Sequence, residues 1–307
     1  MFCLGTKGVG LDIGAEQVKA VAVKKRGQQF ILAGIGLSEI PLRADDDTVA
    51  QAVQSALQEA GAGKHPAVCA AVGGPSVVIK GIKVPPIPLS RVLEAVTWNF
   101  REHGLIPVGE AIFDAQILGT SAEGQMHILA VCTPRELFQH RLHILRMAGV
   151  TPKRIEVEPL AILNAILALQ GVDRDETVVL LSTEAEVPFL CIYQRSAGAP
   201  LVRYFQDQDQ SAAELLAGIR TSVAYFQSEL AVGSALRFVY CGKDSVFAEL
   251  KGELQGLLAL GNYSGAPTLF DPLSMPELGW EKSILPAGKS IEGPQLAQAV
   301  GLAMAAL

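Results

Sequence analysis

Two groups of residues have types and spacings that occur in known chemical sites. The first is Glu136, His140 and His143, whose spacing would place three side chains able to bind zinc on one face of a helix. No fourth ligand and no HExxH motif accompany them in the sequence. We therefore favour an amphipathic helix with exposed histidines over a zinc site.

The second group is Gly288, Lys289 and Ser290, which match the end of a Walker A nucleotide-binding loop. The first glycine of that loop would fall at position 283, which is a serine, and Pro286 interrupts the strand, loop and helix that the motif requires. We reject a Walker A site on these grounds. The sequence also has no GxSxG motif and no other pattern of a Ser–His–Asp hydrolase.

The composition favours a cytoplasmic globular protein. The chain has 307 residues and a net charge of −6, which argues against nucleic acid as its main ligand. Its 5 cysteines are scattered and form no CxxC pair, as expected in a reducing compartment. No uninterrupted apolar stretch reaches the length of about 18 residues that a transmembrane helix needs, so we predict none.

Hydrophobic periodicity predicts strands and helices that alternate along the chain. Residues 8–37 read as three strands joined by short turns, and Asp45 to Thr48 have the residue types of a helix start. The stretch 74–153 reads as an inserted β-α-β-β-α unit whose first helix, 90–103, is capped by Ser90. Strands near 177–181, 188–193 and 200–206 then begin a second strand-rich half.

An internal repeat is the most informative feature of this organisation. Residues 9–23 aligned on 179–193 open the same strand–turn–strand–turn–strand unit, which is followed by a helix. The identical pairs are Val9/Val179, Leu11/Leu181, Ala15/Ala185 and Glu16/Glu186. Two such halves facing a cleft would form a nucleotide-binding clamp. So few identities leave two unrelated hairpins as an alternative.

Several ordered stretches resemble one protein family. Gly10-Leu11-Asp12-Ile13-Gly14, followed by Val18-Lys19, resembles the first phosphate loop of the actin-like ATPases. The stretches 70–85, 129–152, 155–162 and 299–303 resemble the type IV pilus assembly protein PilM family, a relative of FtsA and of the cytoplasmic part of GspL. Each stretch alone is weak, but together they follow the family's order along nearly the whole chain.

The resemblance implies a fold and a domain division. The fold is α/β, of the actin-like (ribonuclease H-like) two-lobed ATPase class, with an inserted β-α-β-β-α subdomain called 1C. Residues 8–73 and 154–173 would form the core of the first lobe (1A), residues 74–153 the inserted subdomain 1C, and residues 174–307 the second lobe (2A/2B).

The resemblance also implies a partner. Proteins of this family are cytoplasmic adaptors of a type IV pilus or type II secretion platform, and they bind the N-terminal cytoplasmic tail of a single-span inner-membrane protein, PilN, between 1A and 1C. Ile79, Ile82, Val84 and Pro85 are the groove residues that we expect, although they would equally suit the core of 1C. The partner would recruit the chain to the inner membrane. We expect no direct membrane insertion, because the last helix (295–307) has no Lys or Arg.

ATP chemistry in this fold depends on three loops. In the first, a glycine lets backbone N–H groups approach the phosphates and an aspartate organises the water around Mg²⁺. Asp12 and Gly14 keep these features, and Asp12 would serve the metal if Mg-ATP binds. For Lys19, on the next strand, we favour a solvent-facing lysine over a phosphate contact.

The other two loops depart from the family pattern. The repeat places Ser182 where the second aspartate belongs and Glu184 where its glycine belongs. A carboxylate about 5 Å from a phosphate costs roughly 3 kcal/mol at an effective dielectric near 20, which would weaken ATP binding on the order of a hundredfold. In the adenosine loop only Gly242 is kept, and Lys243 and Asp244 replace small residues.

Glu158 matches the family's acidic position that orients water or Mg²⁺. We favour the other interpretation, a carboxylate at a helix N-terminus just before Pro159. The sequence therefore predicts a pseudo-ATPase whose binding of ATP with Mg²⁺ is weakened. The alternatives are an active Mg-ATP hydrolase of the same machinery and a filament former like FtsA.

Overall fold

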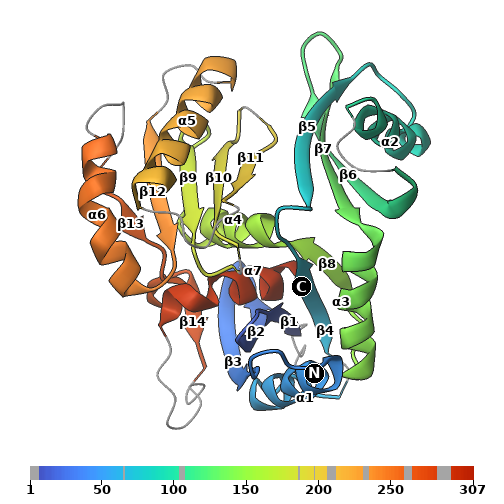
Figure 1. Ribbon diagram of the computed structural model, residues 1–307, viewed down its shortest axis with the longest axis vertical. Coiled ribbons are helices and arrows are strands. Elements are labelled where there is room, and N and C mark those ends of the chain that lie inside the picture. The colour runs from blue at the N-terminus through green and yellow to red at the C-terminus, as the bar shows by residue number, and fades with distance from the viewer. Residues whose placement is uncertain are drawn as a thin grey trace.

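The computed structural model describes residues 7–64, 66–103, 108–185, 187–196, 198–205, 212–230, 235–258, 265–281 and 292–307. Two lobes, each built on its own sheet, enclose the central helices α4 (Glu158–Leu169) and α7 (Ala297–Ala305). A third, smaller sheet stands beside the second lobe at the upper right of Figure 1.

The first lobe contains a six-stranded sheet in the order β14-β3-β2-β1-β4-β8. Its strands are β1 (Lys7–Ile13), β2 (Gln17–Arg26), β3 (Gln29–Glu39), β4 (Ala67–Val72), β8 (Arg154–Val157) and β14 (Leu278–Trp280). Helix α1 (Asp46–Glu59) begins where the sequence predicts, because Asp45 Oδ1 accepts a hydrogen bond from the Thr48 backbone N–H at 2.9 Å.

The second lobe repeats this arrangement in the order β11-β10-β9-β12-β13. Its strands are β9 (Thr177–Ser182), β10 (Phe189–Gln194), β11 (Leu201–Tyr204), β12 (Leu236–Cys241) and β13 (Thr268–Leu269), with helices α5 (Ala212–Leu230) and α6 (Asp244–Leu258). In both sheets three antiparallel strands are followed by a helix and by a strand that returns parallel to the first.

The pairing register confirms the internal repeat. Asp12 lies opposite Lys19 in the β1–β2 pair, and Ser182 lies opposite Phe189 in the β9–β10 pair. These are the positions that the sequence alignment superimposes. Ser182 is therefore the structural counterpart of Asp12, and the alternative of two unrelated hairpins is excluded.

The third sheet has the order β5-β7-β6. It is formed by β5 (Val78–Val84), β6 (Ala111–Thr120) and β7 (Met126–Pro134), with α2 (Val92–Glu102) on one face and α3 (Arg135–Met147) leading back to the first lobe. The predicted Ser90 cap is wrong. A short 3-10 turn, Leu89–Arg91, precedes α2, because the Pro88 carbonyl accepts from the Arg91 N–H at 2.8 Å and draws Ser90 into that turn.

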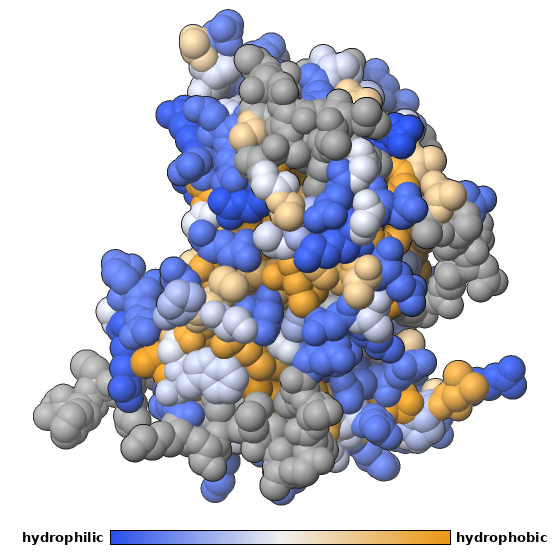
Figure 2. Space-filling view, turned by 90° about the vertical axis from the view of Figure 1, so that its left-hand side faces the viewer, coloured by the Kyte–Doolittle hydropathy of each residue, from blue (hydrophilic) through white to orange (hydrophobic). Residues whose placement is uncertain are grey.

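The largest hydrophobic cluster joins the two lobes. It contains residues of β2, β3, β9, β10 and β12 together with α4 and α7. On the side of the molecule that carries α6, apolar side chains reach the surface at the level of these central helices (Figure 2).

Cys69, Cys132, Cys191 and Cys241 are buried and unpaired. Among the helices that the structure describes, none combines the length and apolar content of a membrane span.

Glycines allow α7 to pack closely on its neighbours. A Cβ added at Gly10 of β1 would overlap the Ala299 carbonyl, and one added at Gly301 would overlap the Ala161 carbonyl of α4. By contrast, a Cβ at Gly252 of α6 would have no atom within 4 Å.

The same substitution in two helices should therefore have opposite effects. We expect Gly301→Ala to lower the free energy of unfolding by about 1–3 kcal/mol, because α4 and α7 must move apart. Gly252→Ala should raise the free energy of unfolding by about 0.5–1 kcal/mol, since alanine favours helix more than glycine does. Urea unfolding of both variants measures the difference, and equal effects would contradict the close packing.

Candidate functional site

A buried lysine joins the turns that follow β1 and β9. The Lys19 ammonium lies 3.6 Å from Asp12 Oδ2 and 3.4 Å from Glu184 Oε2. The three side chains are only 10%, 11% and 13% exposed, respectively. Asp12 and Lys19 belong to the first lobe and Glu184 to the second, so this triad, hereafter the Lys19 bridge, spans the lobes.

The prediction that Lys19 faces solvent is wrong. Strand β2 is buried on both faces, because α1 contacts it on one side and α7 on the other. Burial by itself would lower the pKa of Lys19, but the carboxylates of Asp12 and Glu184 outweigh it and raise the pKa above its ordinary value of 10.5. Lys19 is therefore a cation at neutral pH.

Both oxygens of Asp12 have partners. Oδ2 faces Lys19, and Oδ1 accepts a hydrogen bond from Gln298 Nε2 at 2.9 Å. Gln298 lies on α7 and is buried. Sequence reasoning missed Gln298, because no motif marks it and it is 286 positions from Asp12. Gly14 makes the turn that follows, where its N–H donates to the Gln17 carbonyl at 3.0 Å.

The corresponding turn of the second lobe is occupied by side chains. Ser182 is fully buried, and its hydroxyl has no hydrogen-bond partner in the described parts of the chain. The next residue, Thr183, forms a hydroxyl–hydroxyl hydrogen bond of 2.6 Å with Tyr240. A Cβ added at Gly242 would overlap both of these hydroxyl oxygens. Sequence reasoning missed Thr183 and Tyr240 as well.

Tyr240 is held rigidly at this position. Its ring stacks on Phe247 of α6, with the centroids 5.1 Å apart and the planes 16° apart. Burial raises the pKa of Tyr240 to about 12. Lys243 and Asp244 follow Gly242 at the start of α6 and are exposed. The space beside Gly242 is thus filled by two hydroxyl-bearing side chains.

Glu158 is the first residue of α4. The helix dipole favours a carboxylate at this position, which agrees with the interpretation of Glu158 as a helix N-terminal residue. Its side chain lies against Gly73, where an added Cβ would overlap the carboxylate. Together with burial, the Glu158 charge raises the pKa of Tyr204, a residue of β11 in the second lobe. A role of Glu158 in orienting water stays a prediction.

The four expected groove residues occupy different environments. Ile82 is buried beneath α2, in a cluster with Val96 and Phe100, and Val84 packs against the same cluster. These two side chains therefore belong to the core of the third sheet, which was the alternative interpretation. Ile79 lies on the other face of β5 and packs against a cluster that contains Val157 and Leu160 of the first lobe, whereas Pro85 is exposed.

The two groups rejected on sequence grounds add no site. His140 Nε2 lies 3.0 Å from Asp46 Oδ1, and His143 Nε2 lies 3.8 Å from Asp46 Oδ2, so these exposed histidines contact the start of α1. Within the described ranges no group of three His, Cys, Asp or Glu side chains is arranged to hold a metal ion. Residues 288–290 lie outside the described residues.

The residues of the two turns, as arranged, do not fit Mg-ATP. The oxygens of Asp12 are engaged by Gln298 and Lys19, so they are not free for metal-bound water. Ser182 supplies no second carboxylate, and Glu184 directs a carboxylate toward Lys19, which also contacts Asp12. A nucleotide would have to displace the Lys19 bridge before its phosphates could approach these turns.

The comparisons with known proteins agree on one family and one fold. Residues 10–198 match the family described as type IV pilus assembly protein PilM. A chain of the "PilM-PilN type IV pilus biogenesis complex" is 22% identical, with a TM-score of 0.78 over 97% of this chain and 98% of that chain. No curated protein sequence matches the chain.

Two more distant structures share the fold. The cytoplasmic domain of EpsL, an inner-membrane component of the Vibrio cholerae type II secretion system, has a TM-score of 0.52 at 11% identity and covers 98% of this chain and 95% of its own. A Bacteroides thetaiotaomicron protein with an actin-like ATPase fold and unknown function has a TM-score of 0.52 at 10% identity, over 90% and 96% of the two chains. The chain therefore has the actin-like fold that its sequence predicts.

Proposed function

The chain belongs to the family of the type IV pilus assembly protein PilM, and from this premise we propose that it is a docking protein for the cytoplasmic N-terminal tail of a single-span, PilN-like inner-membrane protein. The likeness to a chain of the PilM–PilN complex, over almost the full length of both chains, supports this proposal. The tail would recruit the chain to the inner membrane.

The Lys19 bridge is the observation that favours docking over ATP hydrolysis. In a nucleotide-binding relative the two turns would hold phosphates between them. Here a buried ion pair holds the turns together directly. We therefore propose that the ATP site is degenerate and that the lobes serve as a fixed scaffold for the docking surface.

We place the tail along the seam between the third sheet and the first lobe. Residues 74–153 would form subdomain 1C, with 8–73 and 154–173 as 1A and 174–307 as the second lobe. An apolar cluster lines this seam; its members are Val77, Ile79, Leu129, Val131, Leu137, Val157, Leu160 and Ala199. Val157 ends β8, an edge strand of the first sheet, and an extended peptide would pair along the side of β8 that no other described strand occupies.

Opposite faces of β5 offer a matched test of this placement. A synthetic peptide with the N-terminal tail sequence of a single-span, PilN-like protein should bind in fluorescence anisotropy titrations. Ile79→Ser should weaken that binding at least about tenfold, which corresponds to about 1.4 kcal/mol. Ile82→Ser should instead lower the melting temperature strongly, because Ile82 is 5% exposed within the core.

One control and one further groove variant make the result decisive. The control, Tyr225→Ser, changes an exposed aromatic residue on α5 of the second lobe and should leave tail affinity unchanged. The second groove variant, Pro85→Arg, changes an exposed groove candidate outside the buried core and should weaken tail binding as Ile79→Ser does. An absence of tail binding, with or without Mg-ATP, would refute the docking proposal. Equal binding by the parent chain and both groove variants would refute the placement.

An active Mg-ATP hydrolase is the second candidate. Asp12, Gly14 and a charged Lys19 meet at one turn, which is the observation in its favour. This candidate requires ATP to raise the melting temperature, since a ligand that binds the folded state must stabilise it. A filament former like FtsA would instead show growth of light scattering with concentration.

A further inference from the structure

The outer face of α2 carries a row of large exposed side chains. Arg91, Glu94, Trp98 and Arg101 are spaced by three, four and three residues, so they lie on one side of the helix. The opposite side is anchored in the third sheet through Val92, Val96 and Phe100. Trp98 is 59% exposed, and Leu89 and Leu93, nearer the start of the helix, are 74% and 48% exposed.

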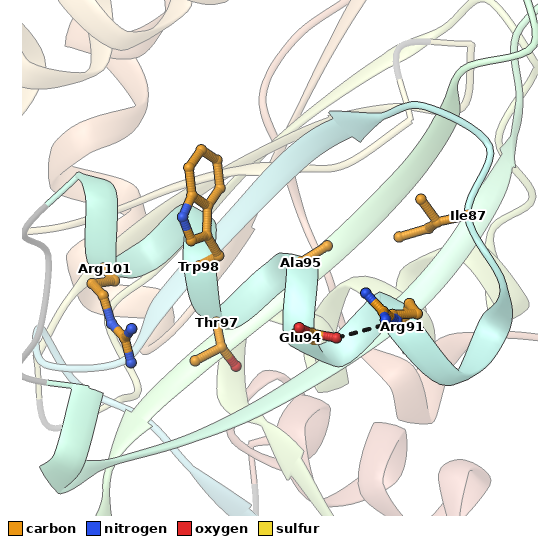
Figure 3. Close-up of a pocket in the computed structure, with 7 residues that line it drawn as sticks. All are labelled: Ile87, Arg91, Glu94, Ala95, Thr97, Trp98 and Arg101. Atoms are coloured by element: carbon orange, nitrogen blue, oxygen red, sulfur yellow. Dashed lines mark ion pairs between the residues drawn. The ribbon is translucent and has the colours of Figure 1, made fainter.

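These side chains border a groove. It has a volume of about 470 Å³ and lies between the row and Ile87 of the preceding loop. Figure 3 shows Trp98 standing off the helix, with Ala95 between it and Ile87, and with Arg91 and Arg101 at opposite ends. Exposed tryptophan flanked by arginine is the composition of protein–protein interface centres.

The charges on this row complement themselves. Glu94 lies in the first half of α2 and Arg101 in the second half, seven residues apart on the same face. Arg101 has no ion-pair partner in the described ranges, and Glu94 contacts Arg91 at 3.5 Å with both side chains about 70% exposed. An ion pair as exposed as this one is weak, so Glu94 is available to a second cation.

We propose that this face docks onto the same face of a second copy of the chain. The two α2 helices would run antiparallel around a two-fold axis that passes between Thr97 and Trp98. In this register Glu94 of each copy meets Arg101 of the other, while the Trp98 side chains cover the groove at the centre. A two-fold interface requires one patch to be complementary to itself, and this row meets that requirement. A parallel pair would set Glu94 against Glu94.

The proposal does not depend on the tail-docking function. The α2 face is separated from the seam by the sheet, since Ile79 and Ile82 lie on opposite faces of β5. Loss of self-association would leave tail binding intact, and loss of tail binding would leave self-association intact. The two proposals can therefore fail separately.

Charge reversal tests the register. Sedimentation equilibrium from about 1 to about 100 µM should give a dimer whose dissociation constant rises at least about tenfold in Glu94→Arg and in Arg101→Glu. The double variant should restore it to within about threefold, because the pair is exchanged rather than removed. Trp98→Ala should be monomeric. A monomeric parent chain, or a double variant no tighter than the singles, would overturn the proposal.

A cross-link tests the axis without altering the row. Thr97→Cys, in a background in which Cys3 is replaced by serine, should form a disulfide-linked dimer under mild oxidation, because position 97 lies beside its own copy. The four described native cysteines are buried and cannot compete. Tyr225→Cys on α5, in the same background, is the control and should form no disulfide-linked dimer. Equal cross-linking by both variants, or an α2 face that binds only an unlike protein, would also overturn the proposal.

Discussion

Replacing Lys19 by methionine should lower the free energy of unfolding by about 3–5 kcal/mol, the usual effect of removing one partner from a buried ion pair. The methylene stem would be kept, so the loss would come from the charge. Asp12 and Glu184, 11% and 13% exposed, would face each other without the cation that now lies within 3.6 Å of both. Urea unfolding followed by circular dichroism measures the change.

Strand β2 provides a matched control for this substitution. Lys24 on the same strand pairs with Glu281 at 2.9 Å, but both side chains are about one-third exposed. Lys24→Met should therefore cost less than about 1 kcal/mol. Adding Asp12→Asn and Glu184→Gln to Lys19→Met should recover most of the loss, since no unpaired charge would remain buried. If Lys19→Met were no more harmful than Lys24→Met, the Lys19 bridge would not be a structural element.

The pH dependence of the Lys19 bridge follows from the raised pKa of Lys19. Stability gained by holding a lysine charged is fully present below its unfolded pKa, near the ordinary value of 10.5, and is lost as pH rises through the folded pKa above it. The contribution of the Lys19 ammonium should thus be constant across the neutral range. The Lys19 ammonium is accordingly not a switch driven by pH changes in the neutral range.

Local patterns were sufficient to predict most of the strands and helices, whereas the prediction of the actin-like fold depended on the family resemblance. The strand, turn and helix order of both halves follows from periodicity, and Asp45 begins α1 because its side chain accepts from Thr48 within the same turn. The internal repeat correctly predicted that Ser182 occupies, in the second lobe, the position that Asp12 occupies in the first. It could do so because the strands pair in the same register in both lobes. These features depend on residues close in sequence.

The interior of the candidate site depends on contacts between distant segments. Lys19 appeared solvent-facing because alternation along β2 cannot show that α7, at the other end of the chain, covers its second face. Gln298 reaches Asp12 for the same reason. On β5, alternation separates Ile79 from Ile82 but does not say which face α2 will cover. The sequence predicted the turns, and tertiary packing determined what fills them.

Restoring the second loop should convert the two turns into a nucleotide site. We expect no rise in the melting temperature of the parent chain at millimolar Mg-ATP, and a clear rise in a Ser182→Asp, Glu184→Gly double variant. Glycine at 184 frees Lys19 for the phosphates, and aspartate at 182 supplies the carboxylate missing from the second turn. Removing the Glu184 charge should improve ATP affinity on the order of a hundredfold. If the ATP concentration then reaches about 100 times the dissociation constant of the double variant, bound ATP adds about 2.7 kcal/mol to the free energy of unfolding.

The controls separate the contributions of the two loops. Glu184→Gly alone should show a smaller rise than the double variant, and EDTA should remove the part that depends on Mg²⁺. Glu281→Gly breaks the other lysine pair of β2 and should show no response to nucleotide. A shift in the parent chain equal to that of the double variant would mean that the site is intact, because the Lys19 bridge would then open readily for ATP. If no variant responds, the obstacle is the filled space beside Gly242, where the Thr183 and Tyr240 hydroxyls lie 2.6 Å apart, and not the Lys19 bridge.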